Sequence, residues 1–309
     1  MNGGCEMEVH QLRYFCEVVR QGTFTRASEA QKVAQPSLSQ QILKLEAELG
    51  GQLFDRMPRS ANLTVFGKVF LPRAERILRE LKDAKTEMLE MTSEEKGVVV
   101  LGVIPTITPY LLPPILDGFS RRHPSVHIRI IEEVTSVLLE RLHQGSIDMA
   151  IVALPVSGAE VSVNELFEER FLAALPEHHP RAKQKRLRLA ELKDDPFLLL
   201  KEGHCFRDNV IAACRESRTH PSVAFESGQF STILAMVAAG MGVSAVPAMA
   251  AQPIPGCRFI PIIGKRSIRK IGIIKLRHHF ETRAQAALVS DIVEETRKKV
   301  EQRAIARLT

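Results

Sequence analysis

A run of seven residues, VVVLGVI at positions 98–104, constrains the fold of this chain more than any other stretch. Gly97 and Pro105 bound the run, and a short apolar run between such residues is typical of a strand buried on both faces. The pattern beyond it predicts a helix over 109–121, a strand over 126–131, a helix over 134–144 and a strand over 147–153. Strands that alternate with helices in this way predict a parallel sheet with right-handed crossovers, which is the α/β class.

The residues that follow repeat this alternation as a second unit. Strands are predicted at 169–174, 197–200, 223–226 and 243–246, with helices between them that begin near Cys205 and Phe230. A strand over 271–276 rejoins the first unit, and a helix over 284–303 closes the chain. We therefore expect two α/β lobes, lobe I from residues 97–165 and 270–309 and lobe II from residues 166–269. Ligands of such folds bind in a cleft beyond the carboxyl ends of the strands.

The first sixty residues have the pattern of three consecutive helices. An apolar stripe marks a helix over 9–20, and Gly22 ends it. A short helix over 24–31 follows, and Pro36 then fits the first turn of a third helix. Helix, short helix, turn and helix in about 40 residues are the helix-turn-helix pattern. We expect this domain to span residues 7–66.

The exposed face of the third helix carries polar side chains near its N-terminal end. These residues lie off the apolar stripe, and they are Gln35, Ser37, Ser39, Gln40 and Lys44. Amides and hydroxyls at this end of a recognition helix suit contacts to base edges and phosphates. Residues 53–56 and 61–64 could pair as a hairpin, with Arg56 and Arg59 at its tip. The alternative is an ordinary polar helix face beside an ordinary loop.

A long helix follows and ends near Ser93. Its apolar residues recur at alternating spacings of three and four, as in Ala74, Ile77, Leu81, Ala84, Met88 and Met91. This heptad pattern is typical of two helices that pair. We interpret residues 67–93 as a linker helix that pairs two chains through Ile77, Leu81, Ala84 and Met88. The alternative is packing against the chain's own core, and Pro72 predicts a kink or a restart of the helix.

Composition and charge narrow the class of protein. The 309 residues are 45% hydrophobic and 25% charged, as in an ordinary globular chain. No apolar run approaches the roughly 18 residues of a membrane span, and the N-terminal residues do not resemble an export signal. We therefore expect a cytoplasmic protein that does not associate with a membrane. The net charge of +6 says little about DNA binding, because residues 1–96 hold 14 cationic and 14 anionic side chains.

The stretch 198–217, LLLKEGHCFRDNVIAACRES, places two cysteines on one predicted helix. Cys214 follows Cys205 by nine residues, so the two lie roughly 13 Å apart along the helix axis and point to opposite sides. A disulfide requires Cα atoms within about 7 Å of each other. Either these thiols never pair, or pairing them destroys the helix. The stretch is therefore a candidate switch.

The two thiols differ in their sequence surroundings. Cys205 starts the helix, where the dipole favours an anion, and His204 and Arg207 could add positive charge. Cys214 lies in the middle of the helix beside alanines, which is typical of a buried, unreactive thiol. This asymmetry suits one thiol that is oxidised to sulfenic acid and a second that condenses with it. Two structural cysteines remain the alternative. A metal site is disfavoured, because His204, Cys205 and Cys214 lack a fourth ligand.

The stretch AQPSLSQQILKLEAELGGQLFDR, with LTVFG after it, resembles the DNA-binding domain of LysR-type transcriptional regulators. The residues that match in order and spacing are Pro36, Ser39, Gln40, Ile42, Leu45, Glu46, Leu49, Gly50, Leu53, Phe54, Arg56, Leu63, Thr64 and Gly67. The resemblance implies a winged helix-turn-helix whose DNA contacts come from Gln35, Pro36, Ser39, Gln40, Arg56 and Arg59. The two lobes in turn resemble the periplasmic-binding-protein-like α/β effector domain of the same family.

The motifs GHCFRDNVIAAC, MVAAGMGVSAVPA and GVIPTITPYLLP are similar to the OxyR branch of this family, the hydrogen-peroxide-sensing activators. The resemblance implies that Cys205 reacts with peroxide and that Cys214 then forms a reversible disulfide with it. It also implies that Thr106, Thr135 and His204 hold the peroxide by hydrogen bonds, with Arg207 and Asp208 near the thiol.

Three hypotheses follow from these patterns. The first, which we favour, is a cytoplasmic transcription activator that needs no cofactor and senses hydrogen peroxide through Cys205 and Cys214. Its partners would be double-stranded DNA, RNA polymerase, further copies of the chain in a homodimer or homotetramer, and a cellular disulfide reductant. The second is a LysR-type regulator that binds a small organic effector in the interlobe cleft while its cysteines stay idle. The third is a thiol peroxidase or another Cys/His enzyme, which would have no need of a helix-turn-helix.

Overall fold

The structure is a computed structural model of the chain. It describes residues 7–57, 60–90, 97–156, 160–216, 221–264, 267–277 and 279–305. The chain divides into an N-terminal unit that reaches Thr92 and a C-terminal unit that contains nearly all the later residues. The N-terminal unit has one hydrophobic core, and the C-terminal unit has two.

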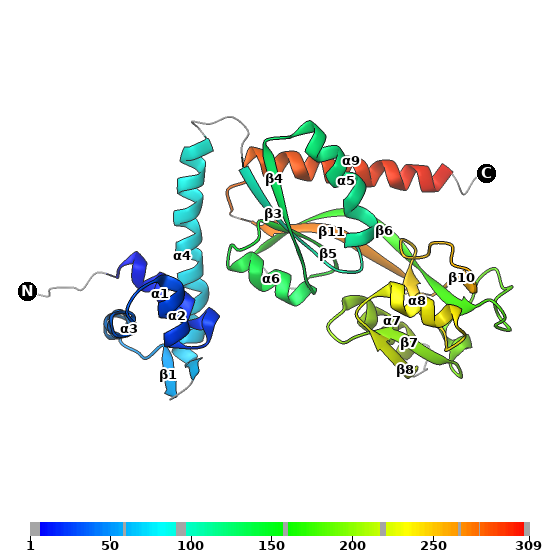
Figure 1. Cartoon of the computed structure of the whole chain (residues 1–309), viewed down its shortest axis with the longest axis horizontal. Helices are drawn as coiled ribbons and strands as arrows, with labels where there is room; N and C mark the ends of the chain where they lie inside the picture. The colour runs from blue at the N-terminus through cyan, green and yellow to red at the C-terminus, as the bar shows by residue number, and fades with distance from the viewer. Residues whose placement is uncertain are drawn as a thin grey trace, which may run out of the picture. The chain divides into compact units, whose positions relative to one another are not determined.

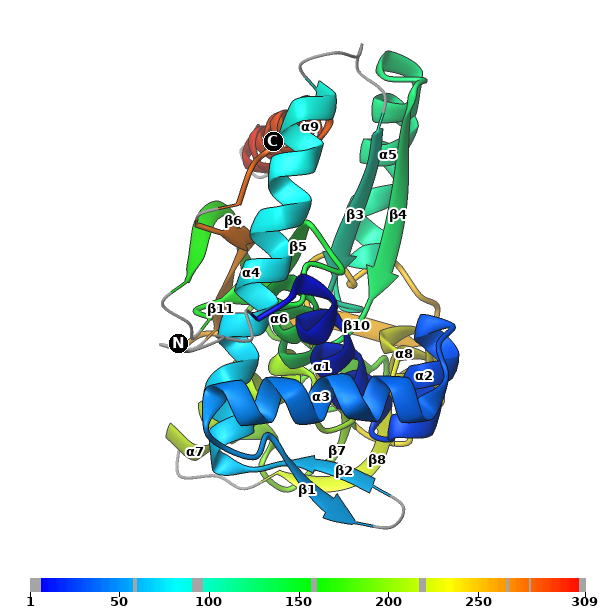
Figure 2. The same cartoon turned by 90° about the vertical axis from the view of Figure 1, so that its left-hand side faces the viewer.

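The N-terminal unit consists of helices around one hairpin. Its elements are α1 (Val9–Gln21), α2 (Phe24–Gln31), α3 (Gln35–Leu49), β1 (Phe54–Met57), β2 (Ser60–Leu63) and α4 (Val65–Glu90). The antiparallel hairpin pairs Phe54 with Leu63 and Met57 with Ser60. Gly22 ends α1 at a φ of 70°, a left-handed conformation that suits glycine. The predicted three-helix pattern and its hairpin are thus confirmed (Figure 2).

Aromatic rings hold this unit together. The ring of Phe15 in α1 lies 5.4 Å from that of Phe54 in the hairpin and 5.3 Å from that of Phe70 in α4. The apolar stripe of α3 enters the same core with Leu38, Ile42 and Leu45. Glu46 of α3 is buried as well, and its Oε1 accepts hydrogen bonds from the backbone N–H groups of Leu53, at 2.7 Å, and Phe54. The carboxylate of Glu46 therefore joins α3 to the start of the hairpin, in addition to the apolar packing.

Helix α4 runs without a break from Val65 to Glu90 and contains Pro72. The predicted restart at Pro72 does not occur. Packing explains why, because Phe70, Leu71 and Ala74 on either side of the proline lie in the core of the unit. The side chains of the predicted pairing stripe are exposed in the single chain, and they are Ile77, Leu81, Ala84 and Met88. Met91 lies outside the described residues.

Lobe I of the C-terminal unit is built on a mixed sheet. Its elements are β3 (Gly97–Val103), α5 (Thr108–Arg122), β4 (Val126–Glu132), α6 (Thr135–His143), β5 (Met149–Leu154) and α9 (Arg283–Ile305), together with parts of β6 (Val161–Pro176) and β11 (Ile268–Leu276). The strand β3 pairs in parallel with β4 and β5, as predicted. The strand β11 joins β5 and β6 in antiparallel fashion. The sheet is therefore not wholly parallel, because β11 returns to β5 from the other lobe.

Lobe II contains the cysteine helix. Its elements are the short 3₁₀ helix η1 (Leu189–Leu192), β7 (Pro196–Leu200), α7 (Cys205–Glu216), β8 (Ser222–Ser227), α8 (Phe230–Ala238), β9 (Ser244–Pro247) and β10 (Cys257–Pro261). β7 and β8 pair in parallel, whereas β9 and β10 pair in antiparallel fashion with β6. The buried side chains of α7 and α8 enter one core, which places α7 against the strands of this lobe.

Strands β6 and β11, rather than loops, connect the two lobes (Figure 1). Along β6, Phe167 packs in the core of lobe I, and Phe171 packs in the core of lobe II. The lobe boundaries predicted at 165/166 and 269/270 therefore fall inside continuous strands. The strand β6 therefore carries side chains of both cores, so residues close to this crossover can connect the two lobes.

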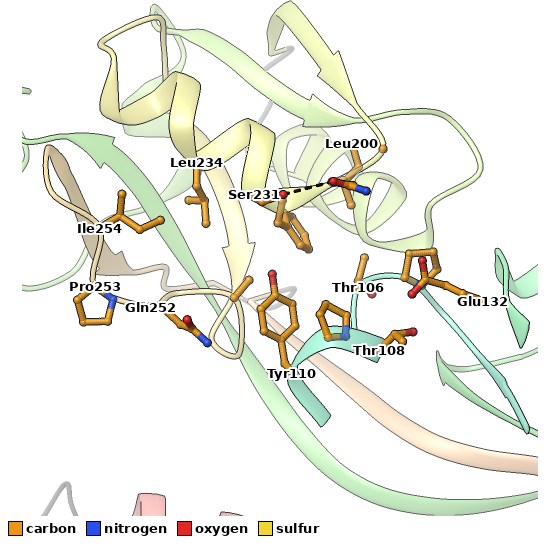
Figure 3. A pocket seen from close by; sticks show the side chains of 16 residues that line it. Thr106, Thr108, Tyr110, Glu132, Leu200, Ser231, Leu234, Gln252, Pro253 and Ile254 are labelled. Carbon is orange, nitrogen blue, oxygen red and sulfur yellow. Dashed lines mark hydrogen bonds between the residues drawn. The ribbon is translucent and has the colours of Figure 1, made fainter. Parts of the chain in front are cut away.

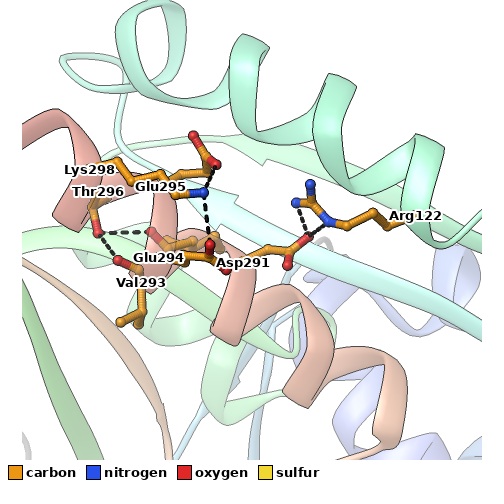
Figure 4. A network of polar contacts seen from close by, with 8 residues as sticks. Arg122, Asp291, Val293, Glu294, Glu295, Thr296 and Lys298 are labelled. Carbon is orange, nitrogen blue, oxygen red and sulfur yellow. Dashed lines mark hydrogen bonds and ion pairs between the residues drawn. The ribbon is translucent and has the colours of Figure 1, made fainter.

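Helix α9 closes lobe I, as predicted, and an ion pair attaches it to α5 (Figure 4). Arg122 Nη2 lies 2.6 Å from Asp291 Oδ2. On α9 itself, Lys298 Nζ lies 2.8 Å from Glu294 Oε1, in an exposed pair that contributes little to stability. The buried Leu288 and Ile292 of α9 join the core of lobe I. Apolar packing therefore contributes more than the ion pairs do to holding α9 on lobe I.

Gly67 lies where the first turn of α4 passes the hairpin. Its backbone N–H donates to Thr64 Oγ1 at 2.9 Å. A Cβ atom on Gly67 would lie 2.1 Å from the carbonyl oxygen of Leu53 and 2.8 Å from the side chain of Leu63. A backbone carbonyl cannot move aside as the end of a flexible side chain can. The approach of α4 to the hairpin therefore requires glycine at this position.

We expect Gly67→Ala to lower the free energy of unfolding of the N-terminal unit by about 2 to 3 kcal/mol, through overpacking. Alanine ordinarily stabilises a helix by about 1 kcal/mol relative to glycine, so a net loss identifies the clash as the larger effect. Urea unfolding followed by circular dichroism measures the change. Lys68→Ala, at the exposed neighbouring position, is the control. A Gly67→Ala protein as stable as the wild type would contradict the close approach.

Candidate functional site

The cysteine helix α7 begins at Cys205, as the sequence predicted. Gly203 has a φ of 90°, a conformation that turns the chain sharply just before the helix. The carbonyl oxygen of His204 then accepts the backbone N–H of Arg207 at 2.9 Å and closes the first turn. Nine residues of continuous helix place Cys205 and Cys214 about 13.5 Å apart along the axis. No disulfide joins them.

The two cysteines contact different hydrophobic cores. Cys205 is half-buried and packs against the core of lobe I. Cys214 is 1% exposed and belongs to the core of lobe II, together with Phe206 and Val210 of the same helix. A bond between the two sulfur atoms would therefore unwind part of α7 and withdraw Cys205 from lobe I.

Opposing effects set the pKa of the Cys205 thiol. Burial raises this pKa above its ordinary value, and the negative charge of Asp208 adds to the rise. The positive charge of Arg269, a hydrogen bond from Thr135 and the backbone N–H of Phe206 act in the opposite direction. The net result is a raised pKa, so most of the thiol is protonated at neutral pH. The thiolate, when it forms, is stabilised by Arg269 and Thr135.

The source of this positive charge differs from the sequence expectation, which assigned it to His204 and Arg207. Burial lowers the pKa of His204, an effect that Glu132 only partly opposes, so this ring is neutral at neutral pH. Arg207 donates to the carbonyl oxygen of Leu200 at 2.9 Å and forms an ion pair with Glu226. The guanidinium of Arg207 thus fastens α7 to strands β7 and β8. Arg207 does not supply the positive charge near the thiol because the helix turns its side chain away from Cys205.

Arg269 was missed by the sequence interpretation, although it lies at the centre of the site. Its Nε donates to Glu169 Oε2 at 2.8 Å, and its Nη1 donates to Thr106 Oγ1 at 2.8 Å. Its guanidinium carbon lies 5.3 Å from the centre of the Phe206 ring, in a cation–π contact. The side chains of Arg269 and Glu169 are each 1% exposed. The available signal was that Arg269 shares the inward side of β11 with Ile271 and Ile273, whereas its position opposite Glu169 depends on strand register.

The two threonines belong to lobe I, whereas the helix α7 that carries Cys205 belongs to lobe II. Thr106 follows β3 and is 3% exposed, and Thr135 begins α6. The hydroxyl oxygen of Thr135 is buried and has no partner among the described residues apart from the Cys205 thiol. Both threonines follow the carboxyl ends of parallel strands, which bring them to one edge of the sheet. The site is therefore assembled only when the two lobes meet.

The other predicted residues of this region are Asp208 and Cys214. Asp208 is exposed in the first turn of α7 and acts on the thiol through its charge. Burial raises the pKa of Cys214 to about 11, so its thiol is protonated at neutral pH. The described residues contain no group of His, Cys, Asp and Glu side chains that could hold a metal ion.

A cleft of about 580 Å³ opens between the lobes beside this group (Figure 3). Thr106, Tyr110 and Glu132 line it from lobe I, and Gln229, Ser231 and Leu234 line it from lobe II. Tyr110 packs against both cores. The volume is in the range of small-molecule sites, and the walls mix apolar surface with a few polar groups. The cleft predicted from the sequence is thus present, and Thr106 is common to the cleft and the thiol site.

The predicted DNA-facing residues cluster at the N-terminal end of α3. Gln35, Pro36 and Gln40 are exposed, and Ser39 is half-buried. The opposite face of the helix is fully buried, so the polar face is directed outward by packing. Arg56 lies in β1, and Arg59 lies outside the described residues. Among the described residues, every helix is too short or too polar to span a lipid bilayer.

Comparisons with known proteins agree with this arrangement. Residues 9–68 match the model of the bacterial regulatory helix-turn-helix protein, lysR family, and residues 92–297 match the LysR substrate binding domain. A probable hydrogen peroxide-inducible genes activator of Mycobacterium leprae is 38% identical over 78% of this chain and 78% of its own length. The DNA-binding transcriptional dual regulator OxyR of Escherichia coli is 33% identical over 91% of this chain and 94% of its own.

A solved structure of a full-length OxyR variant from Pseudomonas aeruginosa is also similar. It superposes with a TM-score of 0.74 at 31% identity and covers 93% of this chain and 95% of its own. The two family matches together extend over most of the chain and include both of its units. The chain therefore belongs to the LysR family, whose members are DNA-binding transcriptional regulators and not enzymes.

Proposed function

We propose that this chain is a transcription activator that responds to hydrogen peroxide through Cys205 and Cys214. One observation carries the proposal: the two thiols occupy opposite ends of one helical segment and pack into different cores. A disulfide between them changes the helix and the contact between lobes in one step. The similarity to proteins named OxyR and hydrogen peroxide-inducible genes activator supports peroxide as the oxidant.

The proposed chemistry has two steps. The Cys205 thiolate attacks one oxygen of hydrogen peroxide, the O–O bond breaks, hydroxide leaves, and the sulfur becomes a sulfenic acid. The Cys214 thiol then attacks the sulfenic sulfur and releases water, which leaves the disulfide. A cellular thiol reductant restores both thiols by thiol–disulfide exchange. Peroxide supplies the oxidising equivalents, so the step needs no bound cofactor.

The surrounding residues have distinct proposed roles. Thr135 and Thr106 hold peroxide by hydrogen bonds, and neutral His204 adds a donor or an acceptor. Arg269 stabilises the thiolate, while Arg207 and Asp208 act on the first turn of α7 rather than on the peroxide itself. The buried hydroxyl of Thr135 supports this assignment, because its one partner among the described residues is the Cys205 thiol, and peroxide bound at the thiol would give it a second.

The response then has to reach the DNA. We propose that α4 pairs two chains through its exposed stripe, and that the polar end of α3 contacts base edges of an operator. Movement of lobe II after disulfide formation changes the spacing of the DNA-binding units in a homodimer or homotetramer. The contact with RNA polymerase changes in turn. This assignment places the protein in the cytoplasm, with the DNA and the reductant.

A second candidate function rests on the interlobe cleft. A cavity of about 580 Å³ could bind a small organic effector that changes the angle between lobes without any cysteine chemistry. The two candidates differ in their dependence on Cys205. A Cys205→Ser protein that still responds normally in a reporter assay would favour the effector.

We expect Cys205→Ser to abolish the response to peroxide, because no thiolate remains to attack it. We expect Cys214→Ser to form the Cys205 sulfenic acid but no disulfide, because the resolving thiol is absent. Dimedone trapping followed by peptide mass spectrometry measures both products. Cys257→Ala, which changes another buried cysteine of lobe II, is the matched control and should oxidise as the wild type does. A folded wild-type protein that never forms the Cys205–Cys214 bond would overturn the sensing mechanism.

The raised pKa of Cys205 predicts a pH dependence with a definite sign. Only the thiolate reacts, and its fraction grows as pH rises toward the pKa. The rate of sulfenic acid formation should therefore increase about tenfold per pH unit between about pH 6 and 8. Thr135→Val should raise the pKa further and slow the reaction about tenfold at fixed pH. Stopped-flow kinetics measure the rate, with Thr108→Val as control. A rate that does not change with pH would contradict a mostly protonated thiol.

We expect Gln40→Ala to weaken binding to DNA fragments that the wild-type protein protects in footprinting by about tenfold, with little change on unrelated DNA. The reason is that an amide can read a base edge, whereas phosphate contacts carry no sequence information. Fluorescence anisotropy measures both affinities. Glu48→Gln, exposed at the far end of the same helix, is the control. An equal loss on both kinds of DNA would remove Gln40 from base recognition.

A further inference from the structure

The connection between β6 and η1 carries the excess charge of lobe II. Residues 166–269 contain 15 Lys and Arg and 10 Asp and Glu side chains, and five of these cations lie in RAKQKRLR at 181–188. The remainder of the lobe is therefore electrically balanced. The peroxide chemistry and the helix-turn-helix make no use of this segment.

Contacts at both ends hold the segment in place. The ring of His179 accepts the backbone N–H of Arg181 at 3.1 Å and lies 3.2 Å from Asp195. The guanidinium of Arg181 lies 3.0 Å from Glu191. At the other end, buried Leu187 forms a β-bridge with Ile262. The cations between these anchors are therefore displayed on a fixed loop, and less conformational entropy is lost when they bind a partner.

The displayed cations are Lys183, Lys185, Arg186 and Arg188, and all four are exposed. Among the described residues, none of the four forms an ion pair with a carboxylate, in contrast to Arg181. Four unpaired charges within six positions repel one another, so a polyanion that neutralises them gains by binding. We call residues 183–188 the basic loop.

We propose that the basic loop binds the phosphodiester backbone of DNA, as a second contact that does not depend on sequence. Lysine and arginine side chains are the usual phosphate ligands. The loop exposes no large apolar side chain, whereas protein–protein interfaces are centred on aromatic or apolar anchors. The first 96 residues have no net charge, so the DNA-reading unit does not supply a bulk basic field of its own. This inference rests on the DNA binding described under the proposed function.

The test replaces the charges and measures the salt dependence of DNA binding. Full-length protein carrying Lys183→Gln, Lys185→Gln and Arg186→Gln is titrated against a duplex of mixed sequence at several salt concentrations. The duplex has about 60 base pairs, or about six helical turns. Each phosphate contact adds about 0.9 to the slope of log affinity against log salt. We expect the slope to fall by about 2 to 3 for each loop engaged, with at least about tenfold weaker binding.

A matched control separates a local site from net charge. Lys193→Gln, Lys201→Gln and Arg215→Gln remove the same charge from exposed, scattered positions of lobe II. This control should keep the wild-type slope, as should Lys183→Arg with Lys185→Arg, which retains the positive charges.

The outcomes distinguish this inference from the proposed function. Wild-type protein that binds no DNA at all would remove the function and the inference together. Wild-type binding with equal slopes for the loop variant and the scattered control would overturn the inference alone. An unchanged slope combined with lost activation in a reporter assay would also reject DNA as the partner, in favour of an acidic protein surface.

Discussion

The buried guanidinium of Arg269 is the group on which the arrangement of the two lobes depends. A charge with a 1% exposed side chain is costly unless every side of it has a partner. Glu169 of β6 provides the negative counter-charge, and Thr106 of lobe I accepts a hydrogen bond. The Phe206 ring of lobe II makes a cation–π contact with the guanidinium. Movement of either lobe leaves part of this charge without a partner. The same guanidinium favours the thiolate of Cys205, so one side chain both joins the two lobes and affects the pKa of the thiol.

The proposed disulfide is incompatible with the helix α7 as the structure shows it. In the reduced state Arg207 fastens the first turn to β7 and β8, and Phe206 packs edge-on against Phe171, with ring centres 4.7 Å apart. A disulfide cannot be made at the axial separation of about 13.5 Å in this helix. Covalent bond formation therefore competes directly with helix packing and with the contact of Cys205 with lobe I. Under the proposed function, oxidation at this site would therefore change the conformation of the chain.

Much of the fold could be predicted because it depends on local pattern. The three N-terminal helices follow from apolar periodicity and from caps such as Gly22 and Thr23, and the alternation of strands and helices follows from short apolar runs. The local pattern is insufficient where contacts between distant segments determine the structure. The helix α4 continues past Pro72 because residues on both sides of the proline pack in the core. The strand β6 likewise continues across the predicted lobe boundary. In both cases contacts between distant segments override the local sequence preference.

The sequence by itself determined the family, the cysteine pair and its conflict with a helix, because spacing and motif order are properties of the chain. It also placed Thr106, Thr135 and Cys205 in one group through resemblance. Only the tertiary structure decided which charge faces the thiol. Arg207 is two residues from Cys205 in sequence, yet the helix turns it away. Arg269 is 64 residues distant, yet strand pairing brings it to Glu169 and to the thiol. Electrostatics depend on distance through space, which sequence separation does not specify.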